Sequence, residues 1–231
     1  MRRLLPLLFL CTSACGVMHG ADDVVEAKTG PIDGIVFVHG INSSGADWSV
    51  MVERFKAEGW PEDRLIAESF TDPSWGCNTL NAAQVADWVH TLEGRGAQRI
   101  AIVAHSMGGL SSRYFMKSLD GHERIAAFIT LGTMHHGLTS PCLAPVGVCV
   151  WKELCSSGRF IRELNTTPTT PGPATWTSIF SDGDQTVPST SSTLDGATNV
   201  LVPGLQHAGP SGLQDSEQVF QSVLESLRNV R

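Results

Sequence analysis

Residues 99–109 read Arg-Ile-Ala-Ile-Val-Ala-His-Ser-Met-Gly-Gly, an apolar run that leads straight to Ser106. No polar residue interrupts positions 100–103, which is typical of a parallel strand covered on both faces. From residue 107 to about residue 119 the pattern becomes helical. The segment therefore predicts a buried strand, a sharp turn at Ser106, and a helix that starts directly after the turn.

The flanking segments repeat this alternation of strand and helix. Strands are predicted at residues 32–38, 64–70, 99–104, 125–131, 176–180 and 199–202, and helices at 47–58, 79–92, 107–119, 160–164 and 216–230. In the helix 79–92, Leu80, Val85, Trp88 and Leu92 are expected near one face. The pattern predicts an α/β fold, with a mostly parallel central sheet and helices on both faces. A length of 231 residues suits one domain.

Between residues 137 and 175 the alternation gives way to a stretch with three cysteines and five prolines. We interpret this stretch as an insertion in the same domain, either a lid or a disulfide-tied excursion. Its cysteines are Cys142, Cys149 and Cys155, and Cys77 is the fourth. Four cysteines predict two disulfides, one short bridge among the three and one long bridge from Cys77, with the pairing left open. Zinc is less favoured because no pair has C-x2-C spacing.

The first residues, Met-Arg-Arg followed by an apolar run and small side chains, are typical of an export signal. The run is shorter than the roughly 20 residues that cross a bilayer, and no later segment reaches that length. We expect a signal peptide at residues 1–21, cut between residues 14 and 21, and a secreted or periplasmic domain at 22–231. A lipid anchor on Cys15 is the less favoured alternative.

The numbers of acidic and basic residues indicate which partners the chain can bind. The chain has 16 Lys and Arg against 23 Asp and Glu, a formal charge of −7. A basic face for a phosphate backbone is therefore not expected, and nucleic acid is excluded as a partner.

Ser106 lies where a nucleophile would be exposed above the edge of a sheet. The strand-serine-helix order is that of a nucleophile elbow, in which the next backbone N–H, here of Met107, faces a developing oxyanion. Small residues are needed two positions before and after the serine, and Ala104 and Gly108 supply them. A second N–H should come from the loop after the first strand, where Gly40 allows the turn and Ile41 donates.

A serine nucleophile needs a base and an orienting carboxylate, in the chain order serine, acid, histidine. His207 is the one histidine downstream of all plausible acids. Asp184 follows a predicted strand and a glycine turn, so it is preferred as the acid. Asp182 is the alternative and is expected to cap that turn. His39 precedes the serine and is expected to be structural.

Several motifs together resemble the small secreted bacterial triacylglycerol lipases and esterases of the α/β-hydrolase superfamily. They are His39-Gly40-Ile41, residues 104–109 (AHSMGG), 132–137 (GTMHHG), 194–197 (LDGA) and Gln206-His207. The resemblance covers residues 32–209. It implies a triad of Ser106, Asp184 and His207, and an oxyanion hole from the backbones of Ile41 and Met107. The chain departs from this family at Asn42, where glycine is common, and in the cysteine-bearing insertion, which the smallest members lack.

These observations predict a serine hydrolase that cleaves carboxylic esters, most of all acylglycerols, through an acyl-enzyme. Short-chain carboxylesterase, thioesterase, acyltransferase and polyester depolymerase share the triad, and an inactive binding protein on the same fold is the rival from another class. Val146, Val148, Val150 and Trp151 are expected to line or cover the acyl pocket.

The mechanism needs no cofactor or catalytic metal. We interpret His135-His136 as structural, and the sequence leaves open whether a structural calcium ion is bound. We expect a monomer that meets a lipid or ester substrate and transiently contacts lipid interfaces.

Overall fold

The computed structural model describes residues 30–144 and 147–230. The predicted signal peptide, its cleavage region, Cys15 and Val146 lie outside the described residues. Within the described part of the chain, no helix combines the length and apolar character needed to cross a bilayer.

Six parallel strands form one sheet, in the order β2-β1-β3-β4-β5-β6. The strands are β1 (Gly34–Val38), β2 (Leu65–Ile66), β3 (Ile100–His105), β4 (Ile125–Leu131), β5 (Thr175–Phe180) and β6 (Thr198–Leu201). All of the pairings between them are parallel. The predicted α/β class is confirmed.

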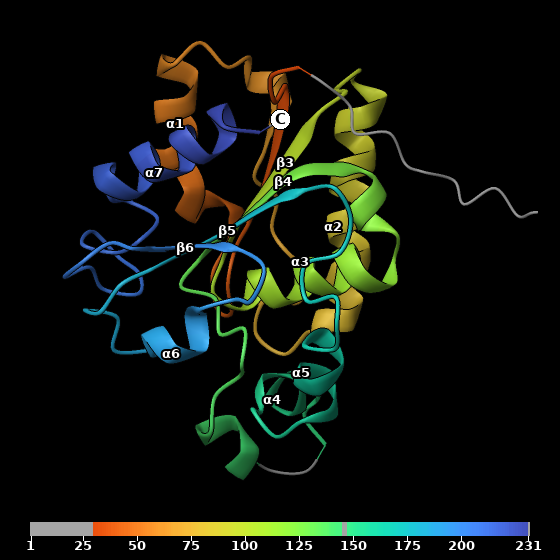
Figure 1. Cartoon of the computed structure of the whole chain (residues 1–231), viewed down its shortest axis with the longest axis vertical. Helices are drawn as coiled ribbons and strands as arrows, with labels where there is room; N and C mark the ends of the chain where they lie inside the picture. Colours follow the sequence, from red (N-terminus) through yellow and green to blue (C-terminus); the bar gives the residue numbers. More distant parts are fainter. Residues whose placement is uncertain (1–29, 145–146, 231) are drawn as a thin grey trace, which may run out of the picture.

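Helices cover both faces of the sheet. They are α1 (Ser49–Ala57), α2 (Asn78–Gly94), α3 (Met107–Ser118), α4 (Cys149–Leu154), α5 (Arg159–Leu164), α6 (Ser189–Ser192) and α7 (Glu217–Arg228). Figure 1 shows α1 and α7 on one face and α2 and α3 on the other, with α4 and α5 beyond one end of the sheet. Side-chain packing gives the same division, because separate hydrophobic clusters lie between the sheet and each helix pair.

The strand β3 lies inside the sheet, between the two layers of helices, and is buried along its whole length. Its side chains alternate between the two clusters. Ala101 and Val103 pack toward α1 and α7, whereas Ile100 and Ile102 pack toward α2 and α3. The continuous apolar run is thus explained by burial on both faces, as predicted.

The second strand is much shorter than the predicted 64–70. Beyond Ile66 the backbone leaves the sheet and packs against the loop that follows β1. There Ser69 Oγ accepts a hydrogen bond from the N–H of Gly45, and the N–H of Phe70 donates to His39 Nε2. These contacts replace the backbone hydrogen bonds that a longer edge strand would make to β1.

The buried face of α2 differs from the prediction at Leu80, whose surface is 65% exposed. Polar residues occupy part of the inward face, because Asn78 and Asn81 are buried. Asn78 Oδ1 accepts a hydrogen bond from Ser111 on α3 at 2.8 Å. A pattern that counts only apolar positions therefore misplaces the face, which also includes Val89.

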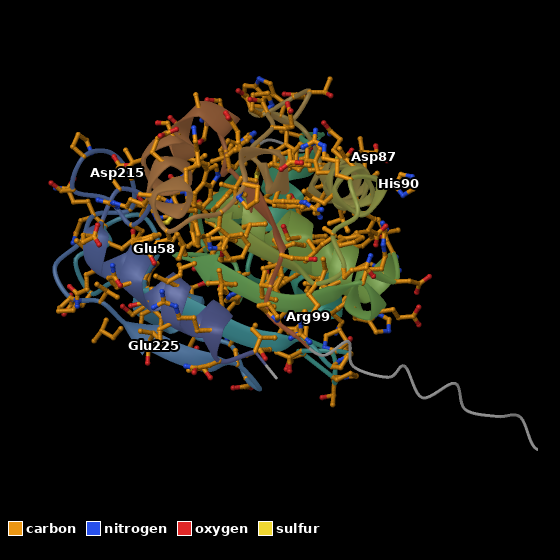
Figure 2. The ribbon with its side chains drawn as sticks, turned by 90° about the horizontal axis from the view of Figure 1, so that it is seen from above. Glu58, Asp87, His90, Arg99, Asp215 and Glu225 are labelled. Carbon is orange, nitrogen blue, oxygen red and sulfur yellow. A yellow bond between two sulfur atoms is a disulfide. The ribbon has the colours of Figure 1, made fainter. Side chains whose placement is uncertain are left out.

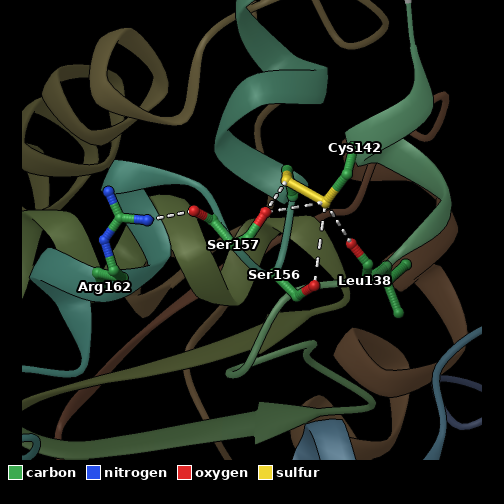
Figure 3. The surroundings of a disulfide bond; sticks show 6 residues. Leu138, Cys142, Ser156, Ser157 and Arg162 are labelled. Carbon is green, nitrogen blue, oxygen red and sulfur yellow. Dashed lines mark hydrogen bonds between the residues drawn. A yellow bond between two sulfur atoms is a disulfide. The ribbon is translucent and has the colours of Figure 1, made fainter.

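Two disulfides tie down the insertion. Cys77 bonds to Cys149 across a sequence separation of 72, and Cys142 bonds to Cys155 across 13. The sequence predicted one long bridge from Cys77 and one short bridge within the insertion, and the structure confirms both. The short bridge closes the insertion on itself, and Figure 3 shows Cys142 beside the carbonyl of Leu138, 3.6 Å from its sulfur.

The long bridge joins the insertion to the start of α2, and Glu153 on α4 strengthens the same junction. Its carboxylate accepts hydrogen bonds from the backbone N–H of Asn78 and, at 3.0 Å, from the hydroxyl of Thr79. A carboxylate at a helix N-terminus is favourably placed in the field of the helix dipole. Helix α4 is therefore anchored covalently and electrostatically.

We predict that the two bridges differ in their effect on stability. Replacing Cys77 and Cys149 by Ala should lower the free energy of unfolding by about 4 kcal/mol, and replacing Cys142 and Cys155 by about 3 kcal/mol, because the longer loop constrains the unfolded chain more in the chain-entropy model. Urea unfolding of both double variants measures this. An equal loss, or a larger loss for the short bridge, would contradict the prediction.

Candidate active site

The turn between β3 and α3 holds Ser106 in an unusual backbone conformation. Its φ is 54° and its ψ is −128°, a combination that non-glycine residues adopt at a cost of order 1–3 kcal/mol. The turn is fixed by its neighbours. Leu131 O accepts the N–H of Ser106 at 2.9 Å, and the hydroxyl of Thr133 donates to Ser106 O at 3.0 Å. The elbow inferred from the sequence is therefore present.

Glycines permit the close packing around this turn. A Cβ on Gly108 would lie 2.3 Å from the carbonyl oxygen of His39, and one on Gly40 would lie 2.9 Å from Ser106 Cβ. Neither position tolerates a side chain without displacement of the backbone. The sequence requirement for small residues near the serine thus has a direct steric cause.

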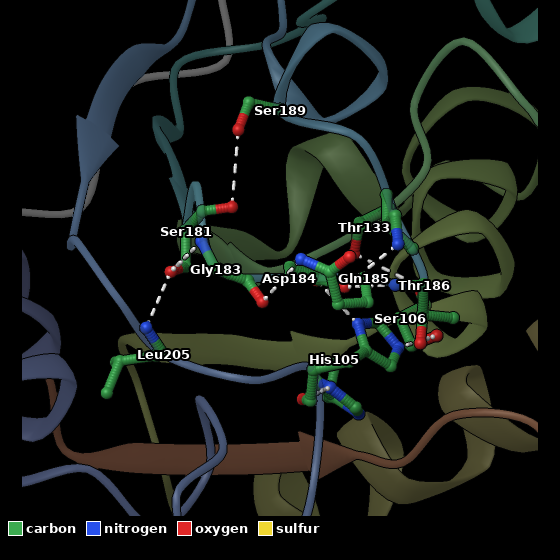
Figure 4. A network of polar contacts seen from close by, with 12 residues as sticks. His105, Ser106, Thr133, Ser181, Gly183, Asp184, Gln185, Thr186, Ser189 and Leu205 are labelled. Carbon is green, nitrogen blue, oxygen red and sulfur yellow. Dashed lines mark hydrogen bonds and ion pairs between the residues drawn. The ribbon is translucent and has the colours of Figure 1, made fainter.

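The structure brings Ser106, His207 and Asp184 into one hydrogen-bonded chain. His207 Nε2 lies 2.8 Å from Ser106 Oγ, and His207 Nδ1 lies 2.7 Å from Asp184 Oδ2. Asp184 comes from the loop after β5 and His207 from the loop after β6 (Figure 4). With a proton on Nδ1 donated to the carboxylate, Nε2 is free to accept the proton of the serine hydroxyl.

Asp184 is held as an ionised acceptor. Its side chain is 1% exposed, and its Oδ1 accepts the N–H groups of Thr186 and Val187, both at 2.8 Å. Burial alone would raise the pKa of Asp184, but the hydrogen bond with His207 and the two backbone N–H groups outweigh burial and lower it. Asp182 does not cap the turn at Gly183 as expected. Its Oδ1 accepts the N–H of Gly204, in the loop after β6, at 2.8 Å, and the N–H of Gly183 donates to Ser181 Oγ instead at 3.1 Å.

His105 makes a contact that sequence reasoning did not find. Its Nε2 lies 2.8 Å from the carbonyl oxygen of His207, and the two rings are 4.6 Å apart. Burial, followed by the proximity of His207, lowers the pKa of His105 to about 3, so the ring is uncharged and Nε2–H donates. His105 therefore fixes the backbone of His207. The only sequence signal for this role is its place directly before the serine.

The predicted oxyanion donors lie beside the serine. Ile41 lines the same cavity as Ser106, and Met107 is the first residue of α3. Within the described residues, the N–H groups of Ile41 and Met107 make no hydrogen bond. The N–H of Asn42 is occupied by Pro73 O at 3.0 Å, and Asn42 has φ 55°, the left-handed conformation that asparagine accepts.

His39 is structural, as its position suggested. Its Nδ1–H donates to Gly40 O at 2.8 Å, and its Nε2 accepts the N–H of Phe70 at 2.9 Å. Both ring nitrogens are used by the backbone, and burial lowers the pKa of His39. The ring therefore fixes the loop after β1, which carries Gly40 and Ile41.

His135 is also buried, with Nε2 3.0 Å from Thr130 Oγ1. Its carbonyl accepts the side-chain amide of Asn165 at 3.0 Å. Among the described residues, the one cluster with metal-ligating atoms is Cys77, Cys149 and Glu153, and its two sulfurs are bonded to each other. His135 is thus held in the core by contacts at its ring and its carbonyl oxygen.

A cavity of about 580 Å³ opens over Ser106 and His207. The insertion and the chain leading to it supply an apolar wall, which contains Met134, Leu138, Pro141, Trp151 and Leu154. The expectation for Val148 and Val150 is corrected. Val150 is fully buried in the cluster beneath the insertion and Val148 packs against that cluster, because α4 turns these side chains away from the cavity that Trp151 lines.

A family model described as "Putative serine esterase (DUF676)" matches residues 33–161. The chain belongs to this family. The matched region contains Ser106, Ile41 and Met107 and ends before Asp184 and His207. The contact between Asp184 and His207 therefore rests on the structure and not on the family match.

Solved structures share the fold of the esterase. The mature Bacillus licheniformis lipase BlEst2 aligns with a TM-score of 0.71 at 19% identity, over 89% of this chain and 96% of that chain. The Legionella pneumophila phospholipase PlaB, in complex with thio-NAD, aligns with a TM-score of 0.73 at 15% identity, over 85% and 58%. A thermophilic esterase from Thermogutta terrifontis aligns with a TM-score of 0.61 at 15% identity, over 87% of this chain and 92% of that chain. The protein therefore has the α/β-hydrolase fold.

We predict that the buried histidines make the esterase sensitive to acid. The pKa values of His39, His105 and His135 are lowered, mainly by burial, so below about pH 6.5 the unfolded chain binds more protons than the folded one. Stability is then fully present above that pH and falls as the pH falls, by up to about 1.4 kcal/mol per pH unit for each histidine. Urea unfolding between pH 7 and pH 4.5 measures the slope.

A matched pair of variants tests the cause of this slope. His135→Asn should reduce the number of protons taken up on unfolding by up to one, and so make the unfolding free energy depend less steeply on pH. This expectation holds whatever the variant does to the unfolding free energy at pH 7. His90→Asn removes an exposed histidine on α2 and is the matched control for the loss of a buried one. Identical slopes in both variants and in the wild type would show that His135 does not contribute.

Proposed function

We propose that the esterase hydrolyses acylglycerols, with Ser106 as nucleophile, His207 as base and Asp184 as the orienting acid. The observation that carries the proposal is the continuous hydrogen-bonded chain from Asp184 through His207 to Ser106 at the floor of a cavity. Burial of Asp184 and fixation of His207 by His105 hold this chain in one geometry. An inactive binding protein would have no need of such an arrangement.

The reaction follows from the positions of these atoms. His207 Nε2 takes the hydroxyl proton while Ser106 Oγ attacks the ester carbonyl carbon, and the N–H groups of Ile41 and Met107 stabilise the oxyanion that forms. The C–O bond to the alcohol then breaks, and His207 returns its proton to the departing alcohol oxygen. Water repeats the sequence on the acyl-enzyme, which releases the carboxylic acid and restores Ser106.

Two features support acylglycerols over short-chain esters. The wall from the insertion offers an acyl chain an apolar surface next to the serine. Exposed apolar side chains also form a rim next to lining residues. Trp75, which is 59% exposed, packs edge-to-face against Trp151 with ring centroids 6.5 Å apart, and Leu143, which is 86% exposed, follows Pro141 two positions along the chain. We further propose that this rim touches lipid surfaces during catalysis and that the disulfide-bonded protein works outside the cytoplasm.

Short-chain carboxylesterase and polyester depolymerase use the same triad and remain the rival activities. Hydrolysis of p-nitrophenyl acetate, octanoate and palmitate by the purified protein separates them. A preference for octanoate or palmitate supports the acylglycerol proposal, and activity on acetate alone contradicts it.

Replacement of the nucleophile tests the chemistry. We predict that Ser106→Ala lowers kcat for p-nitrophenyl octanoate by a factor on the order of 10⁶ and leaves the unfolding transition cooperative, because only the nucleophile is removed. The release of p-nitrophenol and thermal unfolding followed by circular dichroism measure the two effects. Activity within tenfold of the wild type would rule out Ser106 as nucleophile.

The acid is tested by two neighbouring aspartates of different role. We predict that Asp184→Asn lowers kcat by roughly 10⁴, because an amide in place of the carboxylate favours the wrong tautomer of His207. Asp182→Asn keeps an oxygen that can accept the N–H of Gly204, so its effect on kcat should be much smaller. A reversed order in the p-nitrophenyl octanoate assay would assign the acid to Asp182.

A further inference from the structure

The catalytic cavity has a second wall that differs chemically from the apolar one. It is built from the turn before α1 and from the chain between His207 and α7. Its polar side chains are Ser43, Asp47, Ser49, Gln214 and Asp215. Ser106 lines the same cavity, so chemically distinct surfaces are available to the acyl and alcohol parts of an ester.

The second wall is negatively charged. Asp47 accepts hydrogen bonds from the hydroxyl of Ser43 at 2.5 Å and from the N–H of Ser44 at 2.9 Å. The hydroxyl of Ser43 lowers the pKa of Asp47, which keeps the carboxylate ionised at neutral pH. Asp215 adds a second carboxylate to the same wall.

No lysine or arginine is among the described residues that line the cavity. Arg54 lies near this wall, but its Nε binds Glu217 at 2.9 Å and its Nη1 donates to the backbone carbonyl of Asp215 at 2.8 Å. His105, which also lines the cavity, is uncharged. An anionic group placed against this wall would therefore meet the acidic residues Asp47 and Asp215, while the nearby guanidinium of Arg54 is already paired with Glu217.

Gln214 gives the wall an unsatisfied polar group. Its side chain lines the cavity and is 6% exposed, and its Nε2 is buried without a hydrogen-bond partner in the described part of the chain. A buried amide N–H without a partner is unfavourable, and a ligand hydroxyl that pairs with it relieves this cost. The wall is thus suited to a group that carries hydroxyls.

We infer that the alcohol part of the ester binds against Asp47, Gln214 and Asp215, and that this wall selects uncharged, hydroxyl-bearing alcohols such as glycerol over alcohols that carry a phosphate. The inference rests on the proposed ester hydrolysis at Ser106 and specifies its leaving group. Repulsion between these two carboxylates and a phosphate should together lower kcat/KM for the phosphate ester about tenfold at low ionic strength.

Three esters with the same acyl chain test this charge selection. They are 1-octanoylglycerol, 1-octanoylglycerol 3-phosphate and octanoylcholine, each used below its micellar concentration. We expect kcat/KM for the glycerol ester to exceed that for the phosphate ester about tenfold in 20 mM salt, and the choline ester also to exceed the phosphate ester, because it carries no anionic group. In 0.5 M salt the difference should shrink, because screening shortens the range of the repulsion.

Charge-neutral variants identify the source of the selection. Asp47→Asn combined with Asp215→Asn should reduce the glycerol-to-phosphate ratio to about threefold or less. Asn at position 47 retains an oxygen that can accept from Ser43 and Ser44. The control is Asp87→Asn on α2, which removes one negative charge far from Asp215 (Figure 2) and should leave the ratio unchanged. An equal response to the control and the cavity variants would overturn the assignment of the two carboxylates.

Gln214 is tested separately, with ethyl octanoate as an ester whose alcohol has no further hydroxyl. Gln214→Met, which is similar in volume, should lower the ratio of kcat/KM for 1-octanoylglycerol over ethyl octanoate several-fold, because the hydroxyl partner is lost. An unchanged ratio would overturn the assignment of Gln214.

Hydrolysis of p-nitrophenyl octanoate separates failure of this inference from failure of the proposed function. If the wild type cleaves it in a Ser106-dependent manner but treats the glycerol and phosphate esters alike, the charge selection is wrong and ester hydrolysis stands. If none of the esters is cleaved, ester hydrolysis is wrong and the leaving-group assignment fails with it.

Discussion

The left-handed backbone of Ser106 is the constraint on which the rest of this structure depends. A serine with φ 54° persists only where its surroundings determine the turn, and here a fully buried strand, a helix and two backbone hydrogen bonds do so. The turn also brings α3 so close to the loop after β1 that Gly40 and Gly108 cannot carry side chains. Core packing and the position of the nucleophile are therefore one feature.

The remaining groups converge because all six strands are parallel, so the loops after β1, β3, β5 and β6 leave the same edge of the sheet. Ile41, Ser106, Asp184 and His207 come from these four loops in turn. The insertion adds a wall to this edge, and the bridge from Cys77 fixes α4 there. Trp151 is thus presented to the cavity by a short helix that would have little stability alone.

Local patterns predicted the elbow, the α/β class and the preference for Asp184, because each depends on a few adjacent residues and on steric rules. The features that escaped prediction depend on packing between distant segments. Leu80 is exposed because Asn78 binds Ser111, and Val150 faces the core because of how α4 is anchored. His105 and Gln214 gain their roles from contacts or cavities formed by chain segments that no spacing reveals.

Burial of neutral histidines serves the chemistry as well as the fold. The ring of His105 lies 4.6 Å from that of His207, and a positive charge on it would oppose the imidazolium that the proposed mechanism forms at His207. Desolvation lowers the pKa of His105 to about 3 and keeps its ring uncharged at neutral pH, so a positive charge that develops on His207 meets Asp184 instead. The same burial makes protonation of the unfolded chain favourable, and acid sensitivity is the physical consequence of keeping the site free of a competing charge.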